Sequence, residues 1–295
     1  MRYILSVLFL IPSLFFAQVK GVVKDTNGNV IPFVSIRFNK AGLYANADGS
    51  FKILDRITSD SIYFSCIGFT PKAIATNTLP STITLTSERE ELNDVTVYDK
   101  VKSTHQVDFL KTPNSIGNWP SFMGNEIVTY FTPKQLPKNA FFKSISIKFA
   151  KIIELKNMED VDNLRNIVRL NIYTLENDIP TDRIYSSDPV QIDFINQVER
   201  KFAIEKEFIK IPKEGICFGI EILGTYNVQK DAFVKVSNAI IRPVLTHKTS
   251  DLYNAQSYIK STLTAIKPVN LTDLLHKTGF EGERFLNFAF EYVVY

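Results

Sequence analysis

The feature that most constrains this chain is a succession of short alternating strands, separated by glycine-containing turns, near its N-terminus. The first stretch, GVVKDTNGNVIPFVSIRF (residues 21–38), has two alternating apolar runs that flank Asn27-Gly28. Period-two alternation indicates half-buried strands, and Asn-Gly supplies the two positive φ angles of a type I′ hairpin turn. Pro32 cannot donate to a strand ladder, so it belongs at the start of a strand or on an edge. The pattern predicts an all-β fold.

The same pattern continues to residue 98. Asp48-Gly49 predicts a second turn, after which Phe51 and Ile53 point inward. DSIYFSCIGFTPKAI (60–74) reads as two strands about a turn near Gly68, and STITLTSEREELNDVTVY (81–98) adds two more short strands. Strands at this spacing, with turn residues between them, predict a small β-sandwich.

Taken together in this order, these motifs resemble the carboxypeptidase-D regulatory-like domain, a transthyretin-like family, over residues 18–98. The matching residues are Gly21, Val23, Asp25, Gly28, Ile31, Pro32, Val34, Ile36, Asp48, Gly49, Phe51, Ile53, Ile62, Phe64, Ser65, Ile67, Gly68, Phe69, Leu92, Val95 and Val97. The resemblance implies a seven-stranded sandwich with an accessory role, of a kind frequent in exported bacterial envelope proteins. It brings no catalytic residue, and the chain shows no zinc carboxypeptidase signature.

The first residues indicate export. MRYILSVLFLIPSLFFAQ has a basic start at Arg2, an apolar run over residues 3–16, and then Ala17. This order is typical of a secretory signal, with residues 1–17 removed and the mature chain beginning near Gln18. An uncleaved anchor is the alternative, although the run is short for a membrane span of about 20 residues. We therefore expect a periplasmic, outer-membrane-associated or secreted protein with no integral membrane span after cleavage.

The rest of the chain divides into a linker at 99–125 and a second unit at 126–295. The linker holds Trp119 and Phe122, which we expect to dock it on the second unit or to contact a ligand. Strands resume from NEIVTYF (125–131), and KEFIKIPKEGICFGIEIL (206–223) predicts two of them around Gly215. Long strands with one apolar face favour a larger, jelly-roll-like β-sandwich. Only NLTDLLHKTG (270–279) reads as a helix.

No motif for catalysis or cofactor binding stands out. His105, His247 and His276 lack partners at metal-ligand spacing, and no nucleophile elbow, phosphate loop or dinucleotide fingerprint occurs. Cys66 and Cys217 lie in apolar strand-like runs and predict two buried free thiols. No cofactor is expected. A structural calcium ion is an alternative reading of the acidic residues, which are Glu154, Glu159, Asp160, Asp162, Glu176, Asp178 and Asp182.

The net charge of +3 gives no basic field for nucleic acid. We therefore expect a non-enzymatic binding or structural accessory protein of the envelope, whose partner is a glycan or another envelope protein. A separate hypothesis is an interaction module that docks through a sandwich edge strand. The alternative is a hydrolase whose active site lies in residues 126–295.

Overall fold

The computed structural model describes most of the chain. The described residues are 18–88, 105–108, 123–133, 140–151, 160–177, 179–193, 199–234, 241–246, 253–264, 267–277, 287–288 and 290–294. The predicted signal segment, Trp119 and Phe122 lie outside them. In the described part of the chain the fold is nearly all β, with several sheets in a sandwich-like arrangement, as the alternation predicts.

Seven strands form the N-terminal sandwich. They are β1 (Val19–Asp25), β2 (Ser35–Phe38), β3 (Ala41–Tyr44), β4 (Ser50–Ile53), β5 (Ser61–Ser65), β6 (Lys72–Ala75) and β7 (Thr82–Leu85). One sheet has the order β4-β1-β7 and the other β3-β2-β5-β6. The alternating apolar residues of both sheets, among them Ile36, Phe51 and Phe64, share one buried core.

The first turn differs from the prediction. Gly28 has a positive φ of 89°, but Asn27 is not among the described residues with positive φ, so a type I′ turn is wrong. The Asp25 carboxylate accepts hydrogen bonds from the backbone of Asn27 and Asn29, both at 2.8 Å. It thereby stabilises a longer loop in which only the glycine is left-handed. Gly49 and Gly68, at the two other predicted turns, also have positive φ.

The larger sandwich follows from β8 onward. Its strands are β8 (His105–Asp108), β9 (Asn125–Pro133), β10 (Phe142–Lys151), β11 (Leu164–Glu176), β12 (Ile179–Ser186), β13 (Val190–Asp193), β14 (Glu199–Ala203), β15 (Ile216–Asn227), β16 (Ala232–Val234), β17 (Ile241–Pro243), β18 (Leu245–Thr246), β19 (Tyr253–Ser261), β20 (Val269–Asn270), β21 (Asn287–Phe288) and β22 (Phe290–Val294). The short helices are η2 (Thr76–Thr78) in the N-terminal sandwich, and η4 (Val161–Asn163), η5 (Glu205–Glu207) and α2 (Leu271–Lys277) here.

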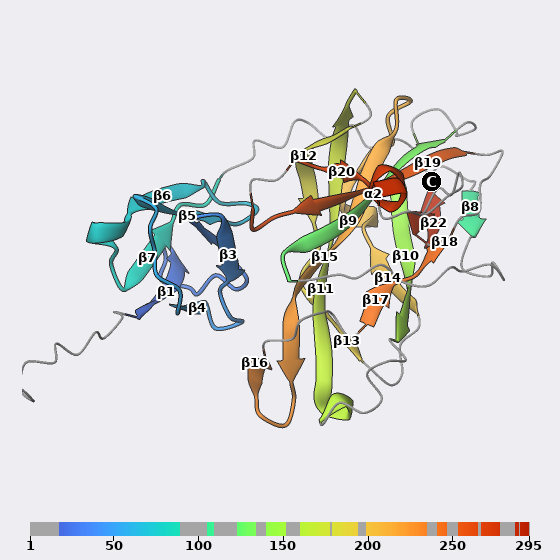
Figure 1. Cartoon of the computed structure of the whole chain (residues 1–295). Helices are drawn as coiled ribbons and strands as arrows, with labels where there is room; N and C mark the ends of the chain where they lie inside the picture. The colour runs from blue at the N-terminus through green and yellow to red at the C-terminus, as the bar shows by residue number, and fades with distance from the viewer. Residues whose placement is uncertain are drawn as a thin grey trace, which may run out of the picture.

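Two sheets make up most of this unit. The eight-stranded sheet has the order β12-β11-β15-β9-β19-β20, with β13 on β11 and β16 on β15. The five-stranded sheet has the order β14-β10-β22-β8, with β17 on β10. Apolar side chains of β10, β11 and β15 pack in one buried core. Figure 1 shows this unit beside the N-terminal sandwich, whose strands are drawn in blue and cyan.

The predicted helix, one predicted strand and the predicted linker have different outcomes in the structure. The predicted helix is present as α2, and the Asn270 side chain accepts a hydrogen bond of 2.8 Å from the Thr272 backbone at its start. The strand predicted before Gly215 is wrong, because the chain forms η5 and then turns at Phe208, where φ is 49°. Part of the predicted linker is the strand β8, which pairs with β22.

Candidate functional site: a buried charged row beneath the N-terminal sandwich

Four charged residues stand in a row across the eight-stranded sheet. In the strand register Arg169 of β11 lies opposite Glu221 of β15, Glu221 opposite Glu126 of β9, and Glu126 opposite Lys260 of β19. Residues paired in this way have Cβ atoms about 5 Å apart on one face of a sheet. We call these four residues the charged row. It carries two carboxylates in the middle and one cation at each end.

The alternation of β15 shows why the row lies on the outer face. Ile216, Phe218 and Ile220 belong to the core between the two sheets, so Cys217, Gly219 and Glu221 point the other way. This outer face is nevertheless buried, because Glu126 and Glu221 are both fully inaccessible to solvent. Buried carboxylates require hydrogen-bond partners or counter-charges, and the neighbouring residues provide both.

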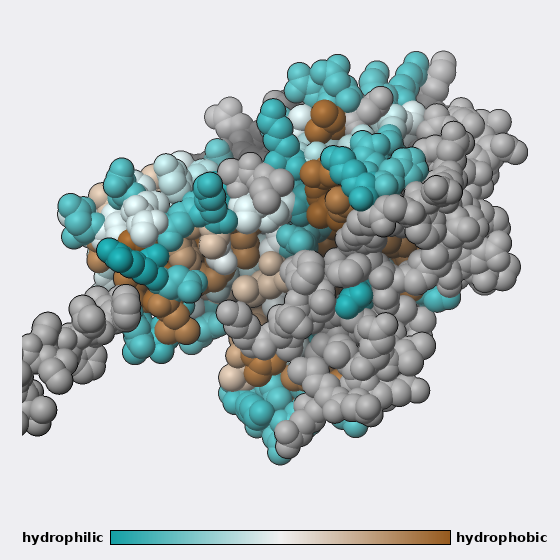
Figure 2. All heavy atoms as spheres, viewed as in Figure 1, coloured by the Kyte–Doolittle hydropathy of each residue, from teal (hydrophilic) through white to brown (hydrophobic). Residues whose placement is uncertain are grey.

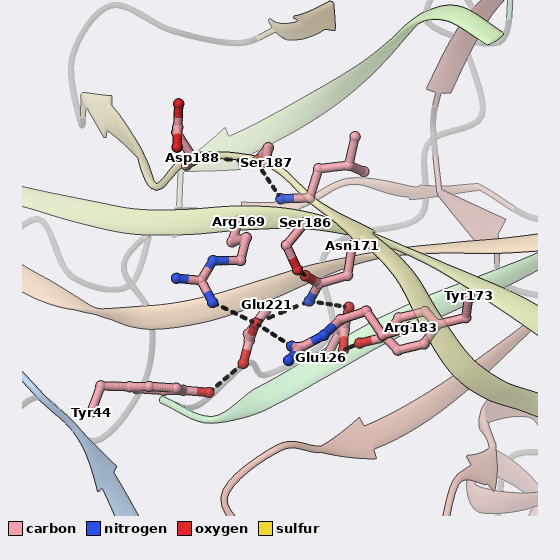
Figure 3. Close-up of polar contacts among 11 residues, drawn as sticks. Tyr44, Glu126, Arg169, Asn171, Tyr173, Arg183, Ser186, Ser187, Asp188 and Glu221 are labelled. Carbon is pink, nitrogen blue, oxygen red and sulfur yellow. Dashed lines mark hydrogen bonds and ion pairs between the residues drawn. The ribbon is translucent and has the colours of Figure 1, made fainter. Parts of the chain in front are cut away.

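Asn171 links the two carboxylates. Its Nδ2 atom donates to Glu126 Oε1 and to Glu221 Oε2, each at 2.9 Å. The Tyr173 hydroxyl donates to Glu126 Oε2 at 2.5 Å, and the Ser186 hydroxyl donates to Asn171 Oδ1. Figure 3 shows these side chains converging from β9, β11, β12 and β15. The amide is therefore oriented from one side and holds both acids from the other.

Arginines compensate the charge of Glu221. Arg169 Nη1 lies 4.0 Å and Arg183 Nη1 lies 3.9 Å from Glu221 Oε2. At the other end of the row, Lys260 Nζ lies 3.7 Å from the centroid of the Tyr173 ring, which is a cation–π distance. The cluster thus combines two acids, three cations and several neutral donors.

The two carboxyl groups have different pKa values. Burial, together with the charge of Glu221, raises the pKa of Glu126 to about 7. Burial also acts to raise the pKa of Glu221, but Arg169, Arg183 and the hydrogen bond from Tyr44 outweigh it and hold that pKa below its usual value. Glu221 is therefore ionised at neutral pH, whereas Glu126 is divided between its two forms.

Gly219 gives the Glu126 side chain its space. A Cβ atom at position 219 would lie 2.5 Å from Glu126 Oε1 and 3.0 Å from its Cδ. The carboxylate therefore lies over the glycine of the neighbouring strand, where any larger residue would displace it.

The N-terminal sandwich closes the cluster. The Tyr44 hydroxyl donates to Glu221 Oε1, and burial keeps the pKa of Tyr44 well above its usual value, so the group remains a donor. Figure 3 shows Tyr44 reaching Glu221 from the ribbon of this sandwich. Tyr44 and Phe33 also pack with apolar residues of the larger unit, which are Ile167, Leu223 and Leu263.

Phe33 extends this apolar contact. It has a positive φ of 54°, uncommon for an aromatic residue, and its ring meets Phe233 edge-on with centroids 5.9 Å apart. Figure 2, in the same view as Figure 1, shows hydrophobic residues towards the middle of the molecule, where the two units meet. The joint thus has a polar centre beside an apolar patch.

A separate pocket of about 540 Å³ opens at the edge of the joint. Its lining residues are Arg37, Phe38, Asn39, Lys40, Ala41, Ser59, Ser61, Tyr63, Leu263 and Thr264. None of the charged row is among them, so the most perturbed acids do not face this space.

The predicted site residues have varied outcomes. Trp119 and Phe122 lie outside the described residues, and their predicted docking or ligand role stays a prediction. His276 is exposed on α2 and His105 lies on β8, whereas His247 is outside the described range. Both cysteines are free thiols as expected, but Cys66 is only half-buried.

The calcium hypothesis also stays open. Glu154 and Glu159 lie outside the described residues, and the Asp160 carboxylate pairs with Lys230 at 2.9 Å. In the described part of the chain no group of three or more His, Cys, Asp or Glu side chains is placed to hold a metal ion.

Among the described residues, no helix is long and apolar enough to span a membrane.

Sequence reasoning missed the charged row, although its members carry a signal. Glu126, Arg169 and Glu221 each interrupt a run of otherwise apolar, strand-like residues: NEIVTYF, IVRLNIYTL and GICFGIEIL. A charged residue within a buried strand requires a partner. Which partner it has depends on the pairing of distant strands.

The fold and the cluster define a class: an all-β protein of two sandwich units joined through a buried ionic network. No family model matches the chain, and no curated protein matches it. Among solved structures, one similar chain holds the cysteine protease and lectin-like domains of Cwp84, a surface layer associated protein of Clostridium difficile. The TM-score is 0.34 with 10% identity, and the match covers 59% of this chain and 32% of that one. The match therefore spans about a third of that protein's chain.

Two other solved structures are similar over more of the chain. A DUF3823 family protein from Parabacteroides merdae has a TM-score of 0.18 and 8% identity, with 70% of this chain and 97% of that chain covered. BcpA, the major pilin subunit of Bacillus cereus, has a TM-score of 0.16 and 11% identity, with 86% and 68% covered.

Proposed function

We propose that this chain is an exported, non-enzymatic accessory protein of the bacterial cell envelope, with a binding or structural role. In this proposal the N-terminal sandwich is a carboxypeptidase-D regulatory-like domain and the linked unit is jelly-roll-like. The basic, apolar and small residues at 1–17 support export, and the ordered motifs over 18–98 support the domain assignment. Its partner is a glycan or another envelope protein.

One observation carries the non-enzymatic part of the proposal. The most perturbed acids, Glu126 and Glu221, are fully buried, hydrogen-bonded to protein groups, and covered by Tyr44 from the other unit. A catalytic acid or base must reach the substrate proton that it transfers, directly or through one water. Here each oxygen of both carboxylates accepts a hydrogen bond from a protein side chain. The cluster therefore serves as a structural joint that fixes one sandwich on the other.

The test is a turnover assay on the mature protein beginning at Gln18, with peptide, ester and glycoside substrates. We expect no turnover above that of the Glu126→Gln and Glu221→Gln variants. Turnover by the wild type that disappears in either variant, in protein that remains folded, would overturn the proposal. A mature N-terminus that retains Met1 would overturn signal cleavage.

A hydrolase with its site in residues 126–295 is the second candidate. The difference between the pKa values of Glu126 and Glu221 favours it. A carboxyl group with a pKa near 7 beside one that stays ionised is the arrangement of a general acid and its partner in glycoside hydrolysis. This function requires the N-terminal sandwich to leave the sheet and expose Glu126 and Glu221. Tyr44→Ala, which removes the covering ring, should then raise the turnover, whereas a structural joint predicts a less stable protein with no turnover.

A further inference from the structure

The pocket at the edge of the joint has an aromatic and cationic floor. Arg37 of β2 stands opposite Tyr63 of β5 in the strand register, and its Cζ lies 6.0 Å from the centroid of the Tyr63 ring. Their neighbours Ile36, Phe38 and Phe64 point into the core of the sandwich. Arg37 and Tyr63 therefore lie on the opposite face of the sheet, where Tyr63 is 51% exposed.

The larger sandwich supplies one wall. Leu263 and Thr264, which follow β19, line the pocket together with residues of the N-terminal sandwich. The backbone at Gly42 packs closely against Leu263. A Cβ atom at Gly42 would lie 3.0 Å from the Leu263 carbonyl oxygen and 3.1 Å from the Leu263 Cβ. The pocket therefore has this wall only while the two units are docked.

The charged side chains that line the pocket are cationic. Two cations, Arg37 and Lys40, line it, and no Asp or Glu is among its described lining residues. Neither cation forms a salt bridge with a carboxylate among the described residues. Asn39 also lines the pocket, but its side chain is committed to the backbone of residues 56–59.

We propose that this pocket binds a small carboxylate-bearing ligand with an apolar or ring-shaped body, and thereby bridges the two sandwich units. The carboxylate pairs with the Arg37 guanidinium and faces the charge of Lys40. The body of the ligand lies against the Tyr63 ring and Leu263. The volume of about 540 Å³ is within the range of small-molecule sites. The inference rests on the proposed binding role and names its ligand class.

Calorimetric titration of the full mature protein tests the proposal with two acids, N-acetyl-leucine and glucuronate. The first presents a peptide-type carboxylate and the second a sugar acid, and each has a neutral counterpart, N-acetyl-leucine amide and glucose. We expect saturable binding of at least one acid at about millimolar or lower concentration, and at least about tenfold weaker binding of its neutral counterpart. Which acid binds more tightly identifies the source of the carboxylate.

Three variants locate the site. Arg37→Gln and Lys40→Gln should each weaken binding of the acid, the first by about tenfold or more. Lys52→Gln removes a cation from β4 of the same sandwich, outside the pocket, and should leave the affinity unchanged. Thermal unfolding without ligand shows that the variants are folded. The proposal is wrong if neither acid binds, if the neutral counterpart binds equally well, or if folded Arg37→Gln binds like the wild type. Hydrolysis of a probe would instead contradict the proposed non-enzymatic function.

Discussion

Deleting one hydroxyl group at the joint should destabilise the protein more than its size suggests. Tyr44→Phe keeps the buried ring against Leu223 and Leu263 but removes the donor to Glu221 Oε1. Glu221 is ionised and has no access to water that could replace the donor. A hydrogen bond to a charged group contributes about 1.5–3 kcal/mol, so we expect a loss of this size in the free energy of unfolding.

A double-mutant cycle tests whether this loss of stability comes from the interaction between Tyr44 and Glu221. Glu221→Gln alone should cost about 3–5 kcal/mol, because it leaves Arg169 and Arg183 without their carboxylate. In the Glu221→Gln background Tyr44→Phe should cost only about 0.5–1.5 kcal/mol, since the hydroxyl then donates to a neutral acceptor. The two changes should therefore be non-additive.

Guanidinium denaturation at neutral pH, followed by circular dichroism, measures each corner of the cycle. Tyr63→Phe is the matched control, because it removes a hydroxyl from a half-exposed tyrosine of the same sheet. It should change stability by less than about 0.5 kcal/mol. If Tyr44→Phe is as mild as the control, or if the two changes add, then Tyr44 does not hold the sandwich to the charged row.

Three further predictions test other parts of the structure. Because the pKa of Glu126 is raised from 4.5 to about 7 in the folded state, its protonated form is favoured there, and the stability of the wild type relative to Glu126→Gln should be highest below pH 4.5. Denaturation at a series of pH values should show this stability difference falling by about 3 kcal/mol as the pH rises through 7. A difference that does not change with pH would contradict the raised pKa of Glu126. Gly219→Ala should cost about 1–3 kcal/mol by crowding the Glu126 carboxylate, and the same change should cost less in a Glu126→Ala background; equal costs would show that the two side chains do not compete. Gly28→Val should cost about 1–3 kcal/mol because its φ is 89°, more than Pro32→Ala, and a neutral valine in denaturation would show that the loop tolerates it.

The sequence predicts the strands well because period-two alternation is local. Phe51, Ile53 and Phe64 point inward as the pattern requires. The turn at Asn27-Gly28 is harder to predict, because the Asp25 side chain stabilises a longer loop that competes with the primed turn. Local apolar content also misleads at Phe208, where the chain turns in place of the expected strand.

The charged row could not be predicted from local stretches of sequence, for a different reason. Glu126 and Glu221 each occupy an ordinary outward position of their own strands, and only the sheet register places them side by side. Tyr44 joins them from the other sandwich, and nothing in its own stretch of sequence indicates that docking. Trp119 draws attention as the single tryptophan, whereas among the described residues the joint uses Tyr44 and Phe33.

The central claim, that the buried row fixes one sandwich on the other, is tested most directly by a distance between the two units. Spin labels at the exposed positions Lys52 and Lys201, in protein whose Cys66 and Cys217 are replaced by alanine, would report that distance by double electron–electron resonance. A fixed joint predicts a single narrow distribution of distances, which broadens when Tyr44→Ala removes the contact. A distribution that is already broad before that change would mean that the sandwiches move independently, and would contradict the claim.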